Sequence, residues 1–270
     1  MSTSTIGGIN LLPTHEKREI YRSIIPDELL ERCELNPYLS DIQGRSLLNL
    51  KARPGSSSVE ISLYHEYGFR DPILYGHLAD TMNGQIHILL YILNDPTSPR
   101  FDVDVMPDGE PTRFGTSRRN LEAERNALQF GLAPGQIRKG LSLLSTAMEA
   151  FEAFIESLGH DLYFAEPLYY HNAIIFERYG FAYQSGKKLM ERIQTEFTPS
   201  AMPRVQVSED GLIQKLDGSS VFRQPEARQS IRLRSWAIHD GILGEPFTNV
   251  TMYKQIGKSA GINTGEGCSW

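Results

Sequence analysis

The sequence contains only two cysteines, Cys33 and Cys268. Two cysteines cannot build the disulfide framework of a small secreted domain, so a reducing compartment is the simpler interpretation. Long hydrophobic runs are also missing: no stretch approaches the roughly 18 apolar residues of a membrane-spanning helix. The N-terminus lacks both the basic region and the long apolar region of a signal peptide. We therefore expect a cytoplasmic protein with no membrane partner.

An excess of positive charge is absent as well. The chain has 27 Lys and Arg against 33 Asp and Glu, which gives a net charge of −6 and argues against nucleic-acid binding. Several catalytic motifs are missing, among them Gly-x-Ser-x-Gly, the Walker loop, the dinucleotide-binding Gly-x-Gly-x-x-Gly and His-Glu-x-x-His. The 270 residues, 40% of them hydrophobic, are enough for one large domain or a domain with an extension.

The first half of the chain predicts helices followed by strands. Residues 14–35 have the pattern of one or two helices, with Thr14 as an N-cap. Alternating or apolar runs then predict strands in "SLLNLKAR", "SVEISLYHE", "PILYGHLADTM", "QIHILLYILND" and "RFDVDVM". Asn83-Gly84 between two of these runs is a strong hairpin signal. We expect an antiparallel meander of about five strands.

The second half predicts alternating helices and strands. A helix in "SRRNLEAERNALQF" ends at Gly131, and "DLYFAE" predicts a strand. The stretch "HNAIIFERYGFAYQSG" predicts a helix and then a last strand. The clearest helix carries an apolar stripe at helical spacing, formed by Ile137, Leu141, Leu144, Met148, Phe151, Ile155 and Leu158.

This order predicts an α+β fold with a mixed, mainly antiparallel sheet and helices on both faces. The sequence pattern changes past residue 200. There "SIRLRSWAI" and "FTNVTMYKQI" alternate like paired strands, and we expect "GINTGEGCSW" to be a loose tail. We therefore divide the chain into a core domain of residues 1–200 and a β-rich C-terminal extension of residues 201–270.

The junction "APGQIRKGLSLL" is the first candidate for chemistry. Pro134 and Gly135 open the predicted long helix, which places Arg138 and Lys139 in its first turn. Cations there oppose the helix dipole, whereas free backbone N–H groups, glycines and two cations together suit a phosphate or pyrophosphate. The alternative is that both side chains simply extend into water.

Together with the later helix and strand, this junction resembles the GCN5-related N-acetyltransferase (GNAT) superfamily. The family's pyrophosphate loop reads Arg/Gln-x-x-Gly-x-Gly/Ala, and "GQIRKGLS" has those residue types with a different spacing. A family helix reading roughly Asn-x-x-Ala-x-x-x-Tyr-x-x-x-Gly-Phe is matched by Phe176, Gly180 and Phe181. The resemblance covers about residues 60–190 and implies a GNAT-like fold that binds acetyl-CoA or another acyl-CoA as co-substrate. The cofactor-binding residues that it implies are Gly135, Gln136, Arg138, Lys139, Gly140, Asn172 and Phe176.

The implied reaction is acyl transfer from coenzyme A, or from a carrier-protein thioester, to an amine. It needs a base for the ammonium and an acid for the leaving thiolate. Phe176 stands where the family often has its acidic tyrosine, so Tyr170 or Tyr179 is expected to replace it. Candidate bases are His171, whose ordinary pKa near 6.5 is well tuned, Glu166 and Asp104. Asp104 shares one face of the predicted strand with Asp102 unless both point to solvent.

Two other functions remain open. One is a non-catalytic module that binds an acyl thioester as a sensor. The other is a metal-dependent enzyme that uses His65, His77 and His87 with the aspartates of "FDVDVM", although no tight ligand motif occurs and we expect no metal. The acceptor would be a small-molecule or peptide amine. Residues 201–270 could close the active site, extend the sheet or build a homodimer.

Overall fold

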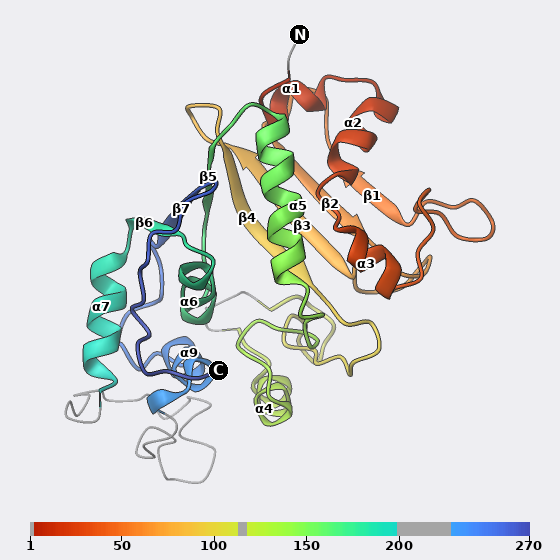
Figure 1. Ribbon diagram of the computed structural model, residues 1–270. Helices are drawn as coiled ribbons and strands as arrows, with labels where there is room; N and C mark the ends of the chain where they lie inside the picture. The colour runs from red at the N-terminus through yellow and green to blue at the C-terminus, as the bar shows by residue number, and fades with distance from the viewer. Residues whose placement is uncertain (1–2, 113–117, 199–227) are drawn as a thin grey trace. The chain divides into compact units, whose positions relative to one another are not determined.

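The computed structural model describes residues 3–112, 118–198 and 228–270. The protein is a mixed α/β structure with helices and a seven-stranded, mostly antiparallel sheet in the order β1-β2-β3-β4-β5-β7-β6 (Figure 1). The chain divides into two compact units that interleave along the sequence. Unit 1 comprises residues 1–98, 140–166 and 253–258, and unit 2 comprises residues 99–139, 167–252 and 259–270.

Unit 1 is the meander with four helices. The side chain of Asp80, at the end of β3, accepts hydrogen bonds from the N–H groups of Ile6 and Gly7 at 2.7 and 2.8 Å and so ties the short α1 to the sheet. The elements of the unit are α1 Ile6–Asn10, α2 Thr14–Arg22, α3 Asp27–Arg32, β1 Leu48–Lys51, β2 Ser58–Leu63, β3 Leu74–Asp80, β4 Ile86–Leu93, α5 Leu144–Ser157 and β5 Leu162–Ala165.

The pairing of β1 to β4 is antiparallel throughout, and strict alternation gives this sheet one fully buried face. Phe151 of α5 packs on Tyr163 of β5 with ring centroids 5.2 Å apart, so α5 covers this face. Figure 1 draws α1, α2 and α5 in front of the strands of this unit. The buried face is formed by Val59, Ile61, Leu63, Leu74, Leu78, Ile86, Ile88, Tyr163 and Ala165.

The described residues of unit 2 form five elements and part of a sixth. Gly131 ends α4 in the left-handed conformation with φ 95°, which glycine adopts at little cost. Gly186 precedes α7 with φ 89°, where an added Cβ would lie 2.8 Å from a Val250 methyl group. The elements are α4 Leu121–Phe130, α6 Tyr170–Arg178, β6 Ala182–Ser185, α7 Lys187–Glu196, α9 Ile231–His239 and the first residues of β7 Thr251–Gln255.

Most elements of the meander and the later helices are confirmed, and five expectations are wrong. "RFDVDVM" is not a strand but an irregular segment with turns, so the meander has four strands. The long helix begins at Leu144, later than predicted. The prediction failed because the apolar stripe continues into the preceding loop, where Leu141 is buried without being helical. Thr14 is the first residue of α2, and Pro13 is its N-cap.

The fourth and fifth errors concern the C-terminal part. "SIRLRSWAI" forms α9, and Ser230 caps it by accepting from the N–H of Leu233. Six of the nine residues of α9 are buried, which obscures the helical period in the sequence. The tail is also ordered, since the N–H and hydroxyl of Thr264 both bond to Glu177. Residues 199–227 lie outside the described residues, and the expected boundary at residue 200 stays a prediction.

Candidate functional site

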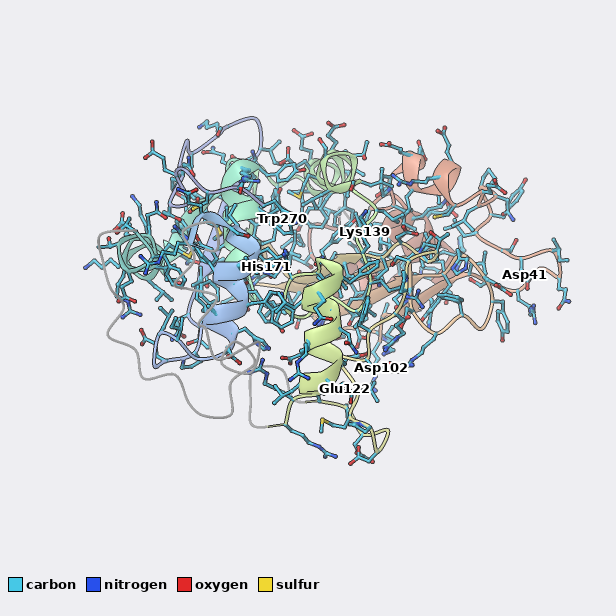
Figure 2. All side chains as sticks on the ribbon, turned by 90° about the horizontal axis from the view of Figure 1, so that it is seen from below. Asp41, Asp102, Glu122, Lys139, His171 and Trp270 are labelled. Atoms are coloured by element: carbon cyan, nitrogen blue, oxygen red, sulfur yellow. The ribbon has the colours of Figure 1, made fainter. Side chains whose placement is uncertain are left out.

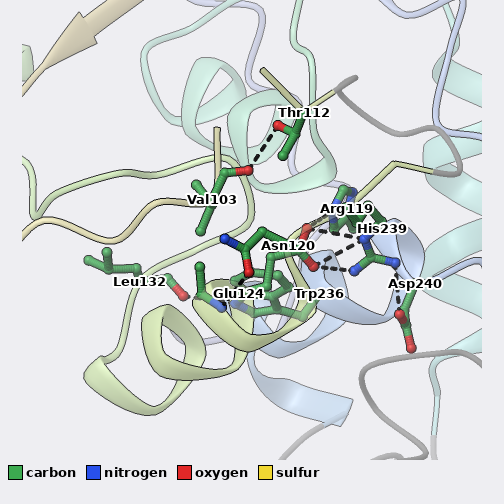
Figure 3. A network of polar contacts seen from close by, with 10 residues as sticks. Val103, Thr112, Arg119, Asn120, Glu124, Leu132, Trp236, His239 and Asp240 are labelled. Atoms are coloured by element: carbon green, nitrogen blue, oxygen red, sulfur yellow. Dashed lines mark hydrogen bonds and ion pairs between the residues drawn. The ribbon is translucent and has the colours of Figure 1, made fainter. Parts of the chain in front are cut away.

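A buried polar network joins the start of α4 to the end of α9 in unit 2 (Figure 3). The Arg119 guanidinium contacts both carboxylate oxygens of Glu124 and donates to Asp240 at 3.0 Å. Nε2 of His239 lies 3.4 Å from Oε1 of the same Glu124. The indole N–H of Trp236 donates to the carbonyl of Leu132 at 2.8 Å, so α9 is also anchored to the loop after α4.

The charges of this network stabilise one another. Burial alone would raise the pKa of the Glu124 carboxyl, but hydrogen bonds from His239 and Arg119 outweigh it and lower that pKa. Burial would likewise lower the pKa of Arg119, yet its bonds to Glu124 and the charge of Asp240 raise it. Glu124 and Arg119 therefore both remain ionised and form a charge pair inside the unit.

His171 lies beside this network in the first turn of α6, next to α9 (Figure 2). Its Nδ1 is 2.8 Å from the hydroxyl of Ser235, its ring stacks on Tyr169, and Trp270 meets it edge-on. Burial, reinforced by His239, lowers its pKa to about 3. The ordinary value near 6.5 that made His171 a candidate base does not apply in the fold, because the residue is only 3% exposed and its lowered pKa keeps the imidazole neutral.

The other expected residues of α6 serve its packing. The Tyr170 hydroxyl is buried, and burial raises its pKa to about 12 although Arg234 opposes the shift. Phe176 packs on Phe181 with ring centroids 4.9 Å apart. Asn172 accepts from the N–H of Tyr169 at 3.2 Å and caps the helix. Tyr179 is the C-cap residue, half-buried at the opposite end of α6 from His171.

The two expected carboxylate bases differ in setting. Asp104 of unit 2 forms a two-oxygen ion pair with Arg100 at 2.7 and 2.9 Å, and Arg100 also contacts Asp102. The strand that was to place both aspartates on one face does not exist, and an arginine neutralises them instead. Glu166 of unit 1 follows β5 directly, is exposed, and donates its backbone N–H to the carbonyl of Ile88 at 3.0 Å.

The expected cofactor loop is divided between the units, which meet in sequence at Lys139 and Gly140. Within unit 2, Gly135 has φ 80° and an added Cβ would lie 2.5 Å from the Tyr169 ring, so this glycine allows a close approach. Oε1 of Gln136 accepts from the N–H of Ala133 at 2.7 Å and closes the turn. Because α5 starts at Leu144, Arg138 and Lys139 precede the helix rather than forming its first turn.

Unit 1 contains the part of this loop that begins at Gly140, and its sheet is interrupted between β4 and β5. The parallel strands β4 and β5 pair only at His87–Phe164 and Ile88–Ala165, and the β3–β4 register shifts at the next residue, leaving Leu89 as a bulge. From Leu89 to Leu93, β4 has no strand partner on its β5 side among the described residues. We call this segment the β4–β5 opening.

The opening leads to the N-terminus of α5. The position of a Cβ on Gly140 lies 3.5 Å from the carbonyl oxygen of Leu93, the last residue of β4. Ser142 has φ 59°, a left-handed conformation unusual for serine, and no side chain caps the first N–H groups of α5. Among the described residues no side chain bonds these N–H groups, and such donors after a strand end suit an anion.

Sequence reasoning missed both of these features. The network depends on α9, whose residues were read as a strand, and no spacing in the sequence brings Glu124 to His239. The bulge arises from pairing rather than from a glycine or proline signal. No group of three or more metal-ligating side chains comes together within residues 3–112, 118–198 and 228–270.

Comparisons with known proteins leave the family open. No family model matches the chain, and neither a curated protein nor a solved structure is significantly similar to it. Within the described part of the chain, no helix is sufficiently long and apolar to cross a bilayer.

Proposed function

We propose that this protein is a GNAT-like acyltransferase, which moves an acyl group from coenzyme A or a carrier-protein thioester to an amine. The observation that carries the proposal is the β4–β5 opening with the α5 N-terminus at its end. A meander, a crossover helix and a parallel fifth strand are the order that the resemblance implies, and they occur together within unit 1.

Backbone groups in the opening suit a thioester. Asn94 donates its N–H to the carbonyl of Ile73, and Ile92 and Leu90 are two and four residues before it on β4, so their backbone groups also turn toward β3. By alternation, the N–H of Tyr91 turns toward the β5 side, where no strand pairs with it. A donor there would polarise a thioester carbonyl, which is how backbone groups stabilise the oxyanion of acyl transfer.

The loop before α5 supports a phosphate contact. Gly140 and Ser142 provide the Gly-x-Gly/Ala half of the family's loop, with Ile137 at the Arg/Gln position. The left-handed Ser142 shows why a small residue is favoured at this place. Arg138 and Lys139, directly before Gly140, add the positive charge that a pyrophosphate attracts.

A non-catalytic thioester-binding module is the second candidate, and the state of α6 favours it. His171 is buried with a pKa of about 3, Tyr170 is buried with a pKa of about 12, and Phe176 has no proton to donate. None of these groups is tuned for proton transfer near neutral pH.

Measurements of binding and of turnover distinguish the acyltransferase from the non-catalytic binding module. Acetyl-CoA and coenzyme A at millimolar concentration should raise the melting temperature of the protein by mass action. Replacing Arg138 and Lys139 by alanine should weaken acetyl-CoA binding in calorimetry, whereas alanine at Lys187 and Lys188, an exposed basic pair that opens α7, should not. Release of free thiol with a panel of amines then identifies a transferase.

The outcomes decide between the readings. No binding of acetyl-CoA by the parent protein would contradict both functions. Binding without thiol release from any amine would favour the module. Equal affinity in the two double variants would remove the loop from the phosphate site.

A further inference from the structure

Strand β4 carries two side-chain polar atoms that are shielded from solvent and have no hydrogen-bond partner among the described residues. They are Nε2 of His87 and the hydroxyl of Tyr91. Leaving such a group unbonded costs about 1–3 kcal/mol, so each requires an explanation. The register places Tyr91 opposite Gly76 on the face covered by α5, and His87 opposite Ala79 on the other face.

His87 lies at the closed end of the β4–β5 opening. It pairs with Phe164 of β5, and the following residue, Ile88, is the last of β4 to pair with that strand. The Phe164 ring stands edge-on to the imidazole with centroids 6.3 Å apart. A thioester carbonyl held at the opening would therefore lie within a few residues of this imidazole along the same strand.

The face that carries His87 differs from the one under α5. Its side chains are half-buried, and it combines aromatic rings with a few polar groups. Glu60 accepts from Lys51 and from the hydroxyl of Tyr75, both on this face. The residues that share the face in unit 1 are Glu60, Tyr75, His77, Ala79, His87, Leu90, Ile92, Leu162, Phe164 and Tyr253.

The imidazole is suited to accept a proton. Burial lowers the pKa of His87, and the charge of Glu166, at the end of β5, opposes that shift without reversing it. His77 is on the same face of β3, and Glu60, paired with it, is held by Lys51. His87 is therefore neutral near pH 7, and an Nε2 without a hydrogen bond can carry a free lone pair.

We propose that His87 is a catalytic residue of the acyl transfer proposed above, with Nε2 accepting the proton of an amine that approaches on the face of the sheet opposite α5. This inference rests on the proposed function. The aromatic and aliphatic side chains around His87 favour an acceptor whose amine is carried on an apolar or aromatic body.

The step balances without a further reactant. The amine nitrogen attacks the thioester carbonyl and forms the C–N bond, and its surplus proton passes to Nε2 of His87. The tetrahedral intermediate collapses, the C–S bond breaks with its electron pair on sulfur, and the imidazolium returns the proton to the thiolate. The products are the amide and the free thiol, and His87 is again neutral.

The test compares His87→Gln with His77→Gln, a histidine of the same face on the neighbouring strand. Acetyl-CoA affinity is measured by calorimetry, and turnover by thiol release with phenethylamine as the acceptor. We expect unchanged affinity in both variants, a loss in kcat of about 10²- to 10⁴-fold in His87→Gln, and little change in His77→Gln. The turnover rate of the parent protein should fall at low pH, only below about pH 6.5, and His87→Gln should not show this fall.

A second measurement applies even if phenethylamine is not turned over. In histidine-labelled protein, the ring signals of His87 are identified by their absence from His87→Gln, and those of His77 by their absence from His77→Gln. The His87 signals should move on addition of acetyl-CoA, and the His77 signals should move less. Full kcat with the same fall at low pH in His87→Gln, or unmoved His87 signals in protein that binds acetyl-CoA, would overturn the proposal. Absence of acetyl-CoA binding in the parent would instead overturn the proposed function on which it rests.

Discussion

The interior of unit 1 is largely apolar, with Asp71 as a buried charged residue, whereas that of unit 2 contains several charged side chains. In unit 1, isoleucine, leucine and valine from the strands meet α5 on one buried face. In unit 2, Glu124, Asp240 and Arg234 are each less than 8% exposed, as is His171. Apolar packing stabilises through area removed from water, while buried charges stabilise only when every partner is present. The two units should therefore respond differently to mutation and pH.

Breaking the charged network should have the largest effect. Arg119→Ala removes the arginine that pairs with Glu124 and Asp240, and removal of one partner of a buried pair costs about 3–5 kcal/mol. Arg118→Ala, the neighbouring arginine with a surface pair to Asp108, should cost about 0–1 kcal/mol. Denaturant unfolding of both variants measures the difference. Equal losses would show that the network does not stabilise unit 2.

Truncation in the apolar core of unit 1 should come next. Ile61→Ala, at a fully buried position of β2, removes three carbon atoms from the packed face and should cost about 2–4 kcal/mol. Ile42→Ala is the matched control, because this isoleucine is fully exposed, and it should change stability by less than about 0.5 kcal/mol. The same unfolding measurement applies. A loss below 1 kcal/mol at Ile61 would contradict the assigned burial.

The dependence of stability on pH should distinguish the units further. The folded pKa of His171 is about 3, below its unfolded value near 6.5, so the folded state binds fewer protons between those values. Stability should therefore fall as the pH drops below about 6.5, by up to about 1.4 kcal/mol per pH unit. The lowered pKa of Glu124 adds a further loss only below about pH 4.3.

Unfolding free energies of the parent and His171→Gln between about pH 4.5 and 7 isolate the histidine contribution. The parent should show the steeper slope, whatever the absolute stability of the variant. Parallel slopes would mean that His171 is not buried as a neutral group.

The smallest expected effect concerns two tyrosines of unit 1. Tyr91→Phe removes a shielded hydroxyl that has no hydrogen-bond partner in the described part of the chain, and it should leave stability unchanged or raise it by up to about 1 kcal/mol. Tyr163→Phe breaks a 3.1 Å hydrogen bond to Glu152 and should lower stability by about 0.5–1.5 kcal/mol. Thermal unfolding followed by circular dichroism compares the pair. A clear loss in Tyr91→Phe would reveal a partner for its hydroxyl.

Local patterns in the sequence determined most of the meander. Alternation predicts β1 to β4 and the Asn83-Gly84 hairpin, because side chains of a strand with one buried face must alternate. Gly131 correctly predicts the end of α4, since a left-handed C-terminal residue favours glycine. These features depend on neighbours within a few residues, and a single sequence contains that information.

Only the tertiary structure decided the settings of the chemical groups. The apolar stripe from Ile137 to Leu158 does not reveal that the helix starts at Leu144, because a buried loop residue such as Leu141 is as apolar as a helical one. The pKa of His171 depends on its burial and then on His239 of α9, and Ser235 of the same helix, 64 residues away in the chain, lies 2.8 Å from its Nδ1. Burial and long-range pairing set the charge states and the bulge at Leu89, and neither can be read from residues that adjoin in the chain.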